Sequence, residues 1–255
     1  QASSFDHDEA ARQQGRLLRR QWQLSDALAV LPADSPSTWQ QRAELGWSAG
    51  HAKEVIESYQ QLATRQPLSR QESLRLLHAA VIDGDAVLVE TLAIQRWQRF
   101  KDTDAILAGF HTAQEQRRPD IARRLLTLAR QDPEPFADSP AYWGLVADSE
   151  LKNLNPRDAL TAIRKGLRLA PADPSLRAGE IYALTMLQHR ELPQRLAEAA
   201  PLASTSQQLT LAVAGGYQSI GDTRRARLWY RRSAEGPAPG AEVLMEIADT
   251  FDQSG

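Results

Sequence analysis

The residues of this chain best suited to chemistry are histidines and carboxylates. His78 and His111 supply imidazole rings, and Glu44 and Asp148 supply carboxylates on either side of them in the sequence. Imidazole nitrogens and carboxylate oxygens are ligands that zinc takes in proteins, about 2 Å from the ion. The four side chains would form a metal site if the fold brought them to one point.

The spacing of the two histidines argues against such a site. His78 and His111 occupy equivalent places in adjacent helical units. Equivalent positions on neighbouring packed helices are about 8–10 Å apart, so the rings would have to lean together to share an ion. We therefore expect two solvated histidines, and neither a metal nor a cofactor in this chain.

A run of arginines is the sharpest charge feature of the sequence. Five guanidinium groups fall within one predicted helix: Arg224, Arg225, Arg227, Arg231 and Arg232. Three of them, Arg224, Arg227 and Arg231, share a helical face. This basic patch could bind an acidic partner or a polyanion, whereas the alternative, a solvated outer face, is the more common outcome.

The composition excludes several classes of function. The chain has no cysteine, which excludes disulfides and thiolate catalysis. Its formal net charge is −2, whereas proteins that bind long nucleic acids are usually strongly basic. No apolar run approaches the roughly 20 residues that span a bilayer. Neither a nucleophile in a catalytic setting nor a glycine-rich phosphate loop occurs. We expect no enzyme, no nucleic-acid partner and no membrane contact from this segment.

These residues are carried by a repeated pair of helices. The clearest pair lies between Pro140 and Pro171, where two apolar stripes flank a turn, with Asn155 as the predicted N-cap and Pro156 as the first residue of the second helix. Five positions recur earlier at a single offset: Trp39, Ala43, Val55, Tyr59 and Pro67 match Trp143, Ala147, Ala159, Ile163 and Pro171. No segment alternates convincingly with period two, so the sequence predicts an all-α chain.

The recurrence divides the chain into three regions. Residues 1–35 are predicted to form an irregular N-terminal helical pair, and residues 241–255 a terminal helix that is a cap or the first helix of a truncated repeat. A Pro-rich stretch at 132–139 predicts an irregularity between repeats. About six repeats lie in residues 36–240: 36–69, 70–102, 103–139, 140–173, 174–206 and 207–240.

This pattern resembles the tetratricopeptide repeat, which has a period of 34 residues and the motif W-x2-L-G-x2-Y, A-x3-F, P. Trp143-x2-Val146-Ala147 and Ala159-x3-Ile163 follow the motif, and the units at Pro36 and Arg70 are 34 residues apart. The sequence departs from the motif at Arg42, Gly46 and Glu150, and throughout the fifth unit. The resemblance implies an α-solenoid, a right-handed superhelix of antiparallel helix pairs.

The resemblance also implies a partner-binding groove on the concave face, which the first helix of each pair lines. The solvent-facing residues there would be Gln40, Glu44, Trp47, His78, Ile82, His111, Gln114, Asp148, Lys152, Tyr182 and Gln218. Such a mixed surface suits an extended or helical peptide better than a small molecule. Trp47 is the aromatic side chain that could anchor a partner or stack on a sugar, although packing against the next unit is an equal alternative.

Within this superfamily, the Arg-rich, Trp-containing repeats are similar to the periplasmic repeat regions of bacterial exopolysaccharide export proteins. That similarity implies a non-catalytic scaffold in the periplasm. Its partner would be another protein, such as a polysaccharide-modifying enzyme or an export component, in a complex that secretes a biofilm polysaccharide. Two alternatives stay open: a glycan-guiding surface that contacts the polysaccharide itself, and a cytoplasmic regulator that senses a peptide in the groove.

Overall fold

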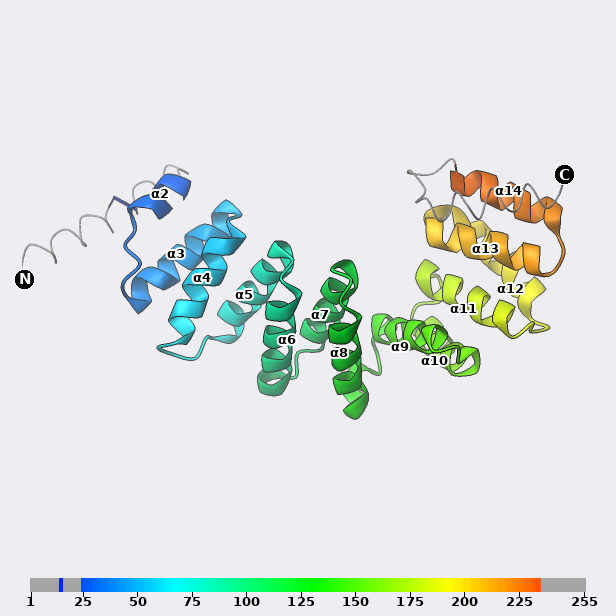
Figure 1. Ribbon diagram of the computed structural model, residues 1–255, viewed down its shortest axis with the longest axis horizontal. Helices are drawn as coiled ribbons and strands as arrows, with labels where there is room; N and C mark the ends of the chain where they lie inside the picture. The colour runs from blue at the N-terminus through cyan, green and yellow to red at the C-terminus, as the bar shows by residue number, and fades with distance from the viewer. Residues whose placement is uncertain (1–13, 16–23, 235–255) are drawn as a thin grey trace, which may run out of the picture. The chain divides into compact units, whose positions relative to one another are not determined.

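The computed structural model describes residues 14–15 and 24–234 (Figure 1). The regular structure within these residues is helical and includes no strand, so the all-α prediction is confirmed for this part of the chain. Of the predicted N-terminal pair, the structure includes α2 (Leu24–Val30). The predicted terminal helix at 241–255 lies outside the described residues.

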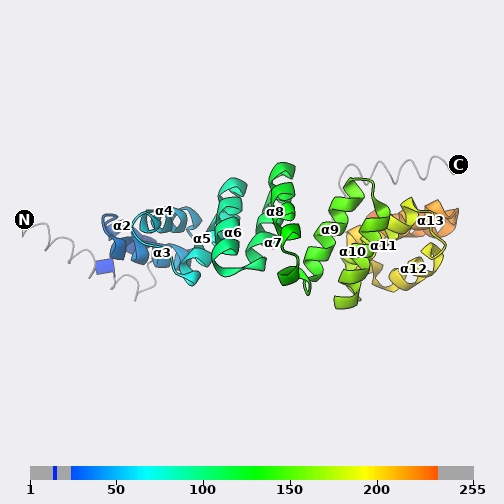
Figure 2. The same ribbon diagram turned by 90° about the horizontal axis from the view of Figure 1, so that it is seen from below.

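The chain forms two compact units, residues 1–135 and 136–255. In the first unit, helices joined by short connections pack against one another in chain order, as Figures 1 and 2 show. Short connections between helices produce antiparallel neighbours. After α2, the helices of this unit are α3 (Pro36–Ala49), α4 (Ala52–Ala63), α5 (Arg70–Asp83), α6 (Ala86–Phe100), α7 (Thr103–Glu115) and α8 (Pro119–Gln131).

The second unit has the same construction. A 3-10 turn, η1 (Glu134–Phe136), lies in the Pro-rich stretch where the sequence predicts an irregularity. The shortest helix pair of the unit, α11 with α12, is the predicted fifth repeat, and a second 3-10 segment follows it. The elements are α9 (Pro140–Lys152), α10 (Pro156–Leu169), α11 (Pro174–Met186), α12 (Leu192–Ala199), η2 (Ala200–Thr205), α13 (Gln207–Ser219) and α14 (Thr223–Ala234).

The first helix of each pair begins after a serine or aspartate whose side chain accepts a hydrogen bond from the backbone of the first turn. These N-caps are Ser35, Ser69, Asp102, Ser139, Asp173 and Ser206. The second helices are capped less regularly. Asn155 is the N-cap of α10 as predicted, but its side-chain oxygen accepts no capping bond, and its amide nitrogen donates to Glu150. Local side-chain chemistry therefore sets the start of each pair between residues 36 and 234.

The turn inside each pair contains one residue in the left-handed backbone region. Glycine, which adopts positive φ without strain, occupies this position in three pairs, and larger residues occupy it in the others. The φ values are 75° at Gly50, 78° at Gly84, 54° at Arg117, 58° at Leu154, 46° at Gln188 and 80° at Gly221. In the three turns without glycine, a residue with a side chain thus adopts the left-handed conformation, which is unfavourable for it.

The core consists of small and apolar side chains at the crossings of neighbouring helices. Ala43, Ala147 and Ala214 on first helices, and Ala159 and Ala226 on second helices, are almost fully buried. Absence of bulk at these positions lets the helix backbones approach closely. A larger side chain at any of them would overpack the crossing, which typically costs about 1–3 kcal/mol.

The buried face of α9 differs from the predicted stripe by one residue. Tyr142 and Leu145 are buried, whereas Trp143 and Val146 are half-buried. The difference arises because α9 packs against both α10 and α11, which widens its buried arc. Trp143 lies at the edge of this arc, where its indole N–H donates to the Ala137 carbonyl at 2.8 Å.

Replacing Leu154 by glycine should raise the free energy of unfolding of the second unit by about 1 kcal/mol. A non-glycine residue in the left-handed region costs roughly 1–2 kcal/mol, and the greater freedom of glycine in the unfolded chain offsets part of that gain. Leu154 is 75% exposed, so little packing is lost. Urea unfolding followed by circular dichroism measures the change.

Leu154→Ala is the matched control, because it removes the apolar side chain but keeps a Cβ atom at positive φ. The alanine variant should not gain the stability of the glycine variant. Equal stability of the two variants would contradict the assignment of strain to this turn.

Candidate partner-binding surfaces

The predicted groove residues of the first unit lie on α3, α5 and α7, and all of them reach solvent. Glu44 is half-buried, and the other residues are exposed: Gln40, Trp47, His78, Ile82, His111 and Gln114. The first helices of the pairs therefore present a polar surface that is interrupted by two large apolar side chains, Trp47 and Ile82.

Trp47, His78 and Ile82 form the most distinctive part of this surface, which we call the Trp47 cluster. The Trp47 and His78 rings stack with centroids 6.2 Å apart and an interplanar angle of 28°. Trp47 is 37% exposed and Ile82 is 70% exposed. Both line a hollow of about 150 Å³ with small and apolar neighbours, among them Val55 and Ala79. The cluster thus offers an apolar depression between two adjacent first helices.

The two histidines make different contacts and do not form a pair. His78 stacks on Trp47, while His111 meets the ring of Phe110 edge-on, with centroids 6.5 Å apart. Residues 14–15 and 24–234 contain no group of three His, Asp or Glu side chains arranged to hold a metal ion. Among the helices that the structure describes, none has the length and apolarity that a membrane crossing needs.

Several predicted groove residues of the second unit form hydrogen bonds with other side chains of the same unit. The Asp148 carboxylate accepts a hydrogen bond from the exposed Lys152 ammonium at 2.7 Å. The side-chain oxygen of the half-buried Gln218 accepts from the hydroxyl of Tyr230, a fully buried residue, at 2.8 Å. Gln218 therefore supports the core, and the 40% exposed Tyr182 is the clearest contact residue of this unit.

The arginines of the basic patch lie on α14, where several of them contact aromatic rings of the same unit. Arg225 lies over Tyr217 at 5.4 Å and pairs with Asp222 at 3.5 Å, and Arg232 lies over Trp229 at 4.6 Å. Arg227 is half-buried, and the other four arginines are exposed. Part of this positive charge thus helps to cover the aromatic side chains of its own unit.

A pair of charges that was not predicted from the sequence joins the second helices α6 and α8. The Arg124 guanidinium donates from Nε to Oε1 of Glu90 at 2.6 Å and from Nη2 to Oε2 at 2.7 Å. Glu90 is only 8% exposed. The hydrogen bond to Glu90 raises the pKa of Arg124. The sequence could have indicated this ion pair, because Glu90 and Arg124 are one repeat period apart. That separation places the two residues on neighbouring second helices.

A second cluster of charges lies at the start of α8. The Arg118 guanidinium donates to both oxygens of Asp120, at 3.1 and 3.0 Å, and Arg124 donates to the same carboxylate at 3.4 Å. The hydrogen bond from Arg118 is the main cause that lowers the pKa of Asp120 to about 2. These contacts order the first turn of α8 at the surface.

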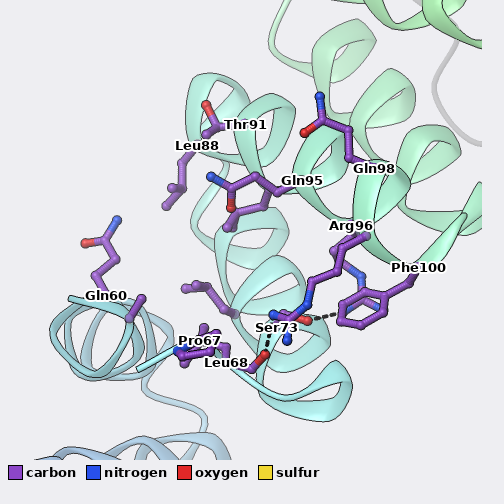
Figure 3. A pocket seen from close by; sticks show the side chains of 14 residues that line it. Gln60, Pro67, Leu68, Ser73, Leu88, Thr91, Gln95, Arg96, Gln98 and Phe100 are labelled. Carbon is purple, nitrogen blue, oxygen red and sulfur yellow. Dashed lines mark hydrogen bonds between the residues drawn. The ribbon is translucent and has the colours of Figure 1, made fainter. Parts of the chain in front are cut away.

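A second, more spacious hollow of the first unit lies on the second helices, where no partner surface was predicted. It measures about 680 Å³ and lies between α4 and α6, with α5 and the loop before it as the floor (Figure 3). We call it the second-helix groove. Its apolar lining comes mainly from Ala63, Pro67, Leu68, Leu88, Leu92 and Phe100.

Arginines gather around Phe100 at one end of this groove. Arg70, Arg96 and Arg99 lie over its ring at 5.8, 5.5 and 4.9 Å. Arg96 is 2% exposed and donates to the Asp102 carboxylate, to the Arg70 carbonyl at 2.8 Å and to the Ser73 hydroxyl at 2.6 Å. This buried network fixes the end of α6 against the start of α5, and so determines the shape of the groove at that end.

The comparison with protein families identifies the fold of these helix pairs. Residues 1–255 match the model of the tetratricopeptide repeat family. The chain belongs to the tetratricopeptide repeat family. The division into about six repeats stays our interpretation of the helix order. Members of this family are generally scaffolds for protein–protein interaction, and the exposed faces described above are the surfaces that this repeat chain offers.

Solved tetratricopeptide repeat structures share the fold at low sequence identity. A tetratricopeptide repeat protein from Parabacteroides merdae ATCC 43184 has a TM-score of 0.52 and 11% identity, over 96% of this chain and 99% of that chain. Yeast Tom70 has a TM-score of 0.51 and 12% identity, over 97% of this chain and 59% of that chain. A search of curated proteins gave no match.

We expect Arg124→Met to lower the urea midpoint of the first unit, because it leaves the buried Glu90 carboxylate without the bidentate donor. Glu90→Ile alone should also be unfavourable, since Arg124 loses its bidentate partner and keeps only the longer contact to Asp120, at 3.4 Å. The double variant Glu90→Ile/Arg124→Met should lose less stability than the sum of the two single changes. Strict additivity in this double-mutant cycle would contradict a direct interaction.

The Asp120 carboxyl should titrate near pH 2 in the folded protein, against about 3.8 without its partners. Its pKa is lowered on folding, so the stability from its contacts is present above about pH 4 and is lost as the pH falls through about 2. Carboxyl ¹³C NMR measures the midpoint. Arg118→Ala should raise it, whereas Arg123→Ala should not, and an unchanged midpoint in Arg118→Ala would refute the assigned cause.

Proposed function

We propose that this protein is a non-catalytic scaffold that binds another protein through its first helices, with the Trp47 cluster as the anchor point. The observation that carries this proposal is the exposed Ile82 side chain beside the Trp47–His78 stack. Ile82 and Trp47 border an apolar depression that is open to solvent on an otherwise polar surface. Partly exposed tryptophans in such depressions dominate the energetics of many interfaces. Membership of the tetratricopeptide repeat family supports the same function.

The depression favours an apolar side chain of a peptide over a polar small ligand. Its lining contains Val55, Ala79 and the faces of Trp47 and Ile82, and it holds about 150 Å³, which is the scale of one large side chain. The Gln40 and Glu44 side chains on α3 and the His111 and Gln114 side chains on α7 supply polar groups on the adjacent first helices. A peptide that crosses the first helices would thus bury one side chain and make polar contacts on either side of it.

We further propose that the scaffold works in the periplasm, within a complex that exports an exopolysaccharide. The support is the similarity of its Arg-rich, Trp-containing repeats to the periplasmic repeat regions of such export proteins, of which the Pel-polysaccharide export protein PelB is the example. The partner would then be a polysaccharide-modifying enzyme or another export component. Titration of tryptophan fluorescence with charged oligosaccharides tests the alternative, a surface that guides the glycan itself.

Site-specific crosslinking tests the protein partner. A photoreactive benzoylphenylalanine at Ile82 should capture a discrete protein from a Gram-negative periplasmic extract, because its side chain projects from the Trp47 cluster. The same residue at Leu169, which is 42% exposed on a second helix, is the matched control and should capture nothing at that mass. Equal capture at both positions, or at neither, would count against the proposal.

Trp47→Ala should weaken binding of the captured partner at least about 30-fold, which corresponds to ~2 kcal/mol, the usual threshold for an interface hot spot. Leu169→Ala should change the affinity by less than about twofold. Isothermal titration calorimetry measures both. An affinity that does not respond to Trp47→Ala would remove the cluster from the interface.

A further inference from the structure

We propose that the second-helix groove binds an amphipathic helix of a partner protein that presents apolar side chains on one face and carboxylates near one end. The groove is formed by α4, α5 and α6, with second helices as its walls, whereas the Trp47 cluster lies on the first helices α3 and α5. The inference is therefore independent of the proposed function, and it adds a second interaction surface of defined chemistry.

An open space separates α4 from α6. The next two second helices, α6 and α8, pack against each other and are joined by the Glu90–Arg124 pair. In α4, one repeat period before Glu90, the residue is Ile56, which cannot form such a pair. A hollow of about 680 Å³ with a largely apolar lining remains between α4 and α6.

The space has the form of a groove with two helices as its walls. In Figure 3, Gln60 extends from α4 on one side, while Leu88, Thr91 and Gln95 extend from α6 on the other, and Phe100 lies at one end. Two helices with an apolar floor form the setting in which an amphipathic helix places its i, i+3, i+4 and i+7 side chains. The amides of Gln60 and Gln95 at the rim can hydrogen-bond polar residues that flank this stripe.

The Phe100 end of the groove carries positive charge. The charge of Arg96 is balanced by Asp102. Arg99 donates to a neutral group, the Leu68 carbonyl, at 2.7 Å, and Arg70 contacts the Phe100 ring. Within residues 14–15 and 24–234, neither Arg70 nor Arg99 forms an ion pair with a carboxylate. This end of the groove therefore has positive charge that no carboxylate of the described residues balances, beside an apolar space. A helix whose apolar stripe is followed by carboxylates would be complementary to both features.

The experiment selects ligands without assuming a natural partner. The full chain is used to select binders from a phage library of 14-residue helical peptides, and selected peptides are then synthesised and titrated by fluorescence anisotropy. Two variants test the groove: Ala63→Trp fills the space from α4, and Arg70→Glu reverses the charge at the Phe100 end. Arg123→Glu, an exposed arginine on α8, is the matched control for the change in net charge.

These variants are chosen to leave the fold intact. Ala63 is exposed, and Arg70 is the first residue of α5, where a negative side chain interacts favourably with the helix dipole. The bond from Arg96 reaches the backbone carbonyl of residue 70, and so does not depend on that side chain. Circular dichroism and thermal melting should therefore match the unsubstituted protein.

We expect the selected peptides to combine an apolar i, i+3, i+4, i+7 stripe with carboxylates near one end. Ala63→Trp and Arg70→Glu should each weaken binding at least tenfold, whereas Arg123→Glu should change it less than twofold. A copy of the peptide with lysine in place of these carboxylates should bind the Arg70→Glu variant better than it binds the unsubstituted protein. Affinity should also fall with ionic strength.

Three results would overturn the proposal. The first is a selection that yields no helical acidic peptide, or peptides whose affinity does not respond to Ala63→Trp and Arg70→Glu. The second is an oligomer that dissociates in the Ala63→Trp variant in light-scattering measurements, which would make a second copy of this chain the occupant. The third is that the protein binds charged oligosaccharides but no peptide, and that the two groove variants abolish the binding of these oligosaccharides.

Discussion

The burial of apolar side chains between consecutive helices is the constraint on which the rest of this structure depends. A single helix pair cannot cover its own apolar stripe, so each pair is completed by its neighbours. Tyr59 and Ile163, equivalent in the two units, are fully buried, and small residues such as Ala43 and Ala159 permit the close crossings beside them. In the second unit one cluster of buried side chains runs from α9 to α14, so side chains that could contact a partner are left to the exposed faces.

Arginine side chains connect helices that the apolar core alone would leave less firmly oriented. Arg42 donates to Glu54 at 2.7 Å and to the carbonyls of Leu28 and Leu31, which joins α2 to the first pair. Arg96 and Arg124 do the same between α5 and α6 and between α6 and α8. Guanidinium groups suit this role because several donors in one plane can satisfy carboxylates and carbonyls at once. These three arginines therefore have a structural role.

The two faces of the first unit have different chemistry as a consequence of the same stacking. On the first helices, Trp47 and Ile82 border a small depression in a polar surface. On the second helices, the separation of α4 from α6 leaves a larger space with positive charge at one end. The two proposed surfaces of this unit therefore lie on different sets of helices and differ in size and charge.

The sequence by itself determined where the helices begin and how they pair. Ser35, Ser69 and Asp102 cap the helices that follow them, and prolines such as Pro140 and Pro156 occupy first helical positions, because these preferences involve only residues within one turn of each other. It also indicated the exposure of His78, whereas it left open whether Trp47 faces solvent or packs against the next unit; in the structure Trp47 is partly exposed and stacks on His78. Only the tertiary structure decided the second-helix groove, the Glu90–Arg124 pair and the engagement of Gln218 with the core. Those features depend on the distance and angle between helices that are far apart in the chain, and many side-chain contacts together set that geometry.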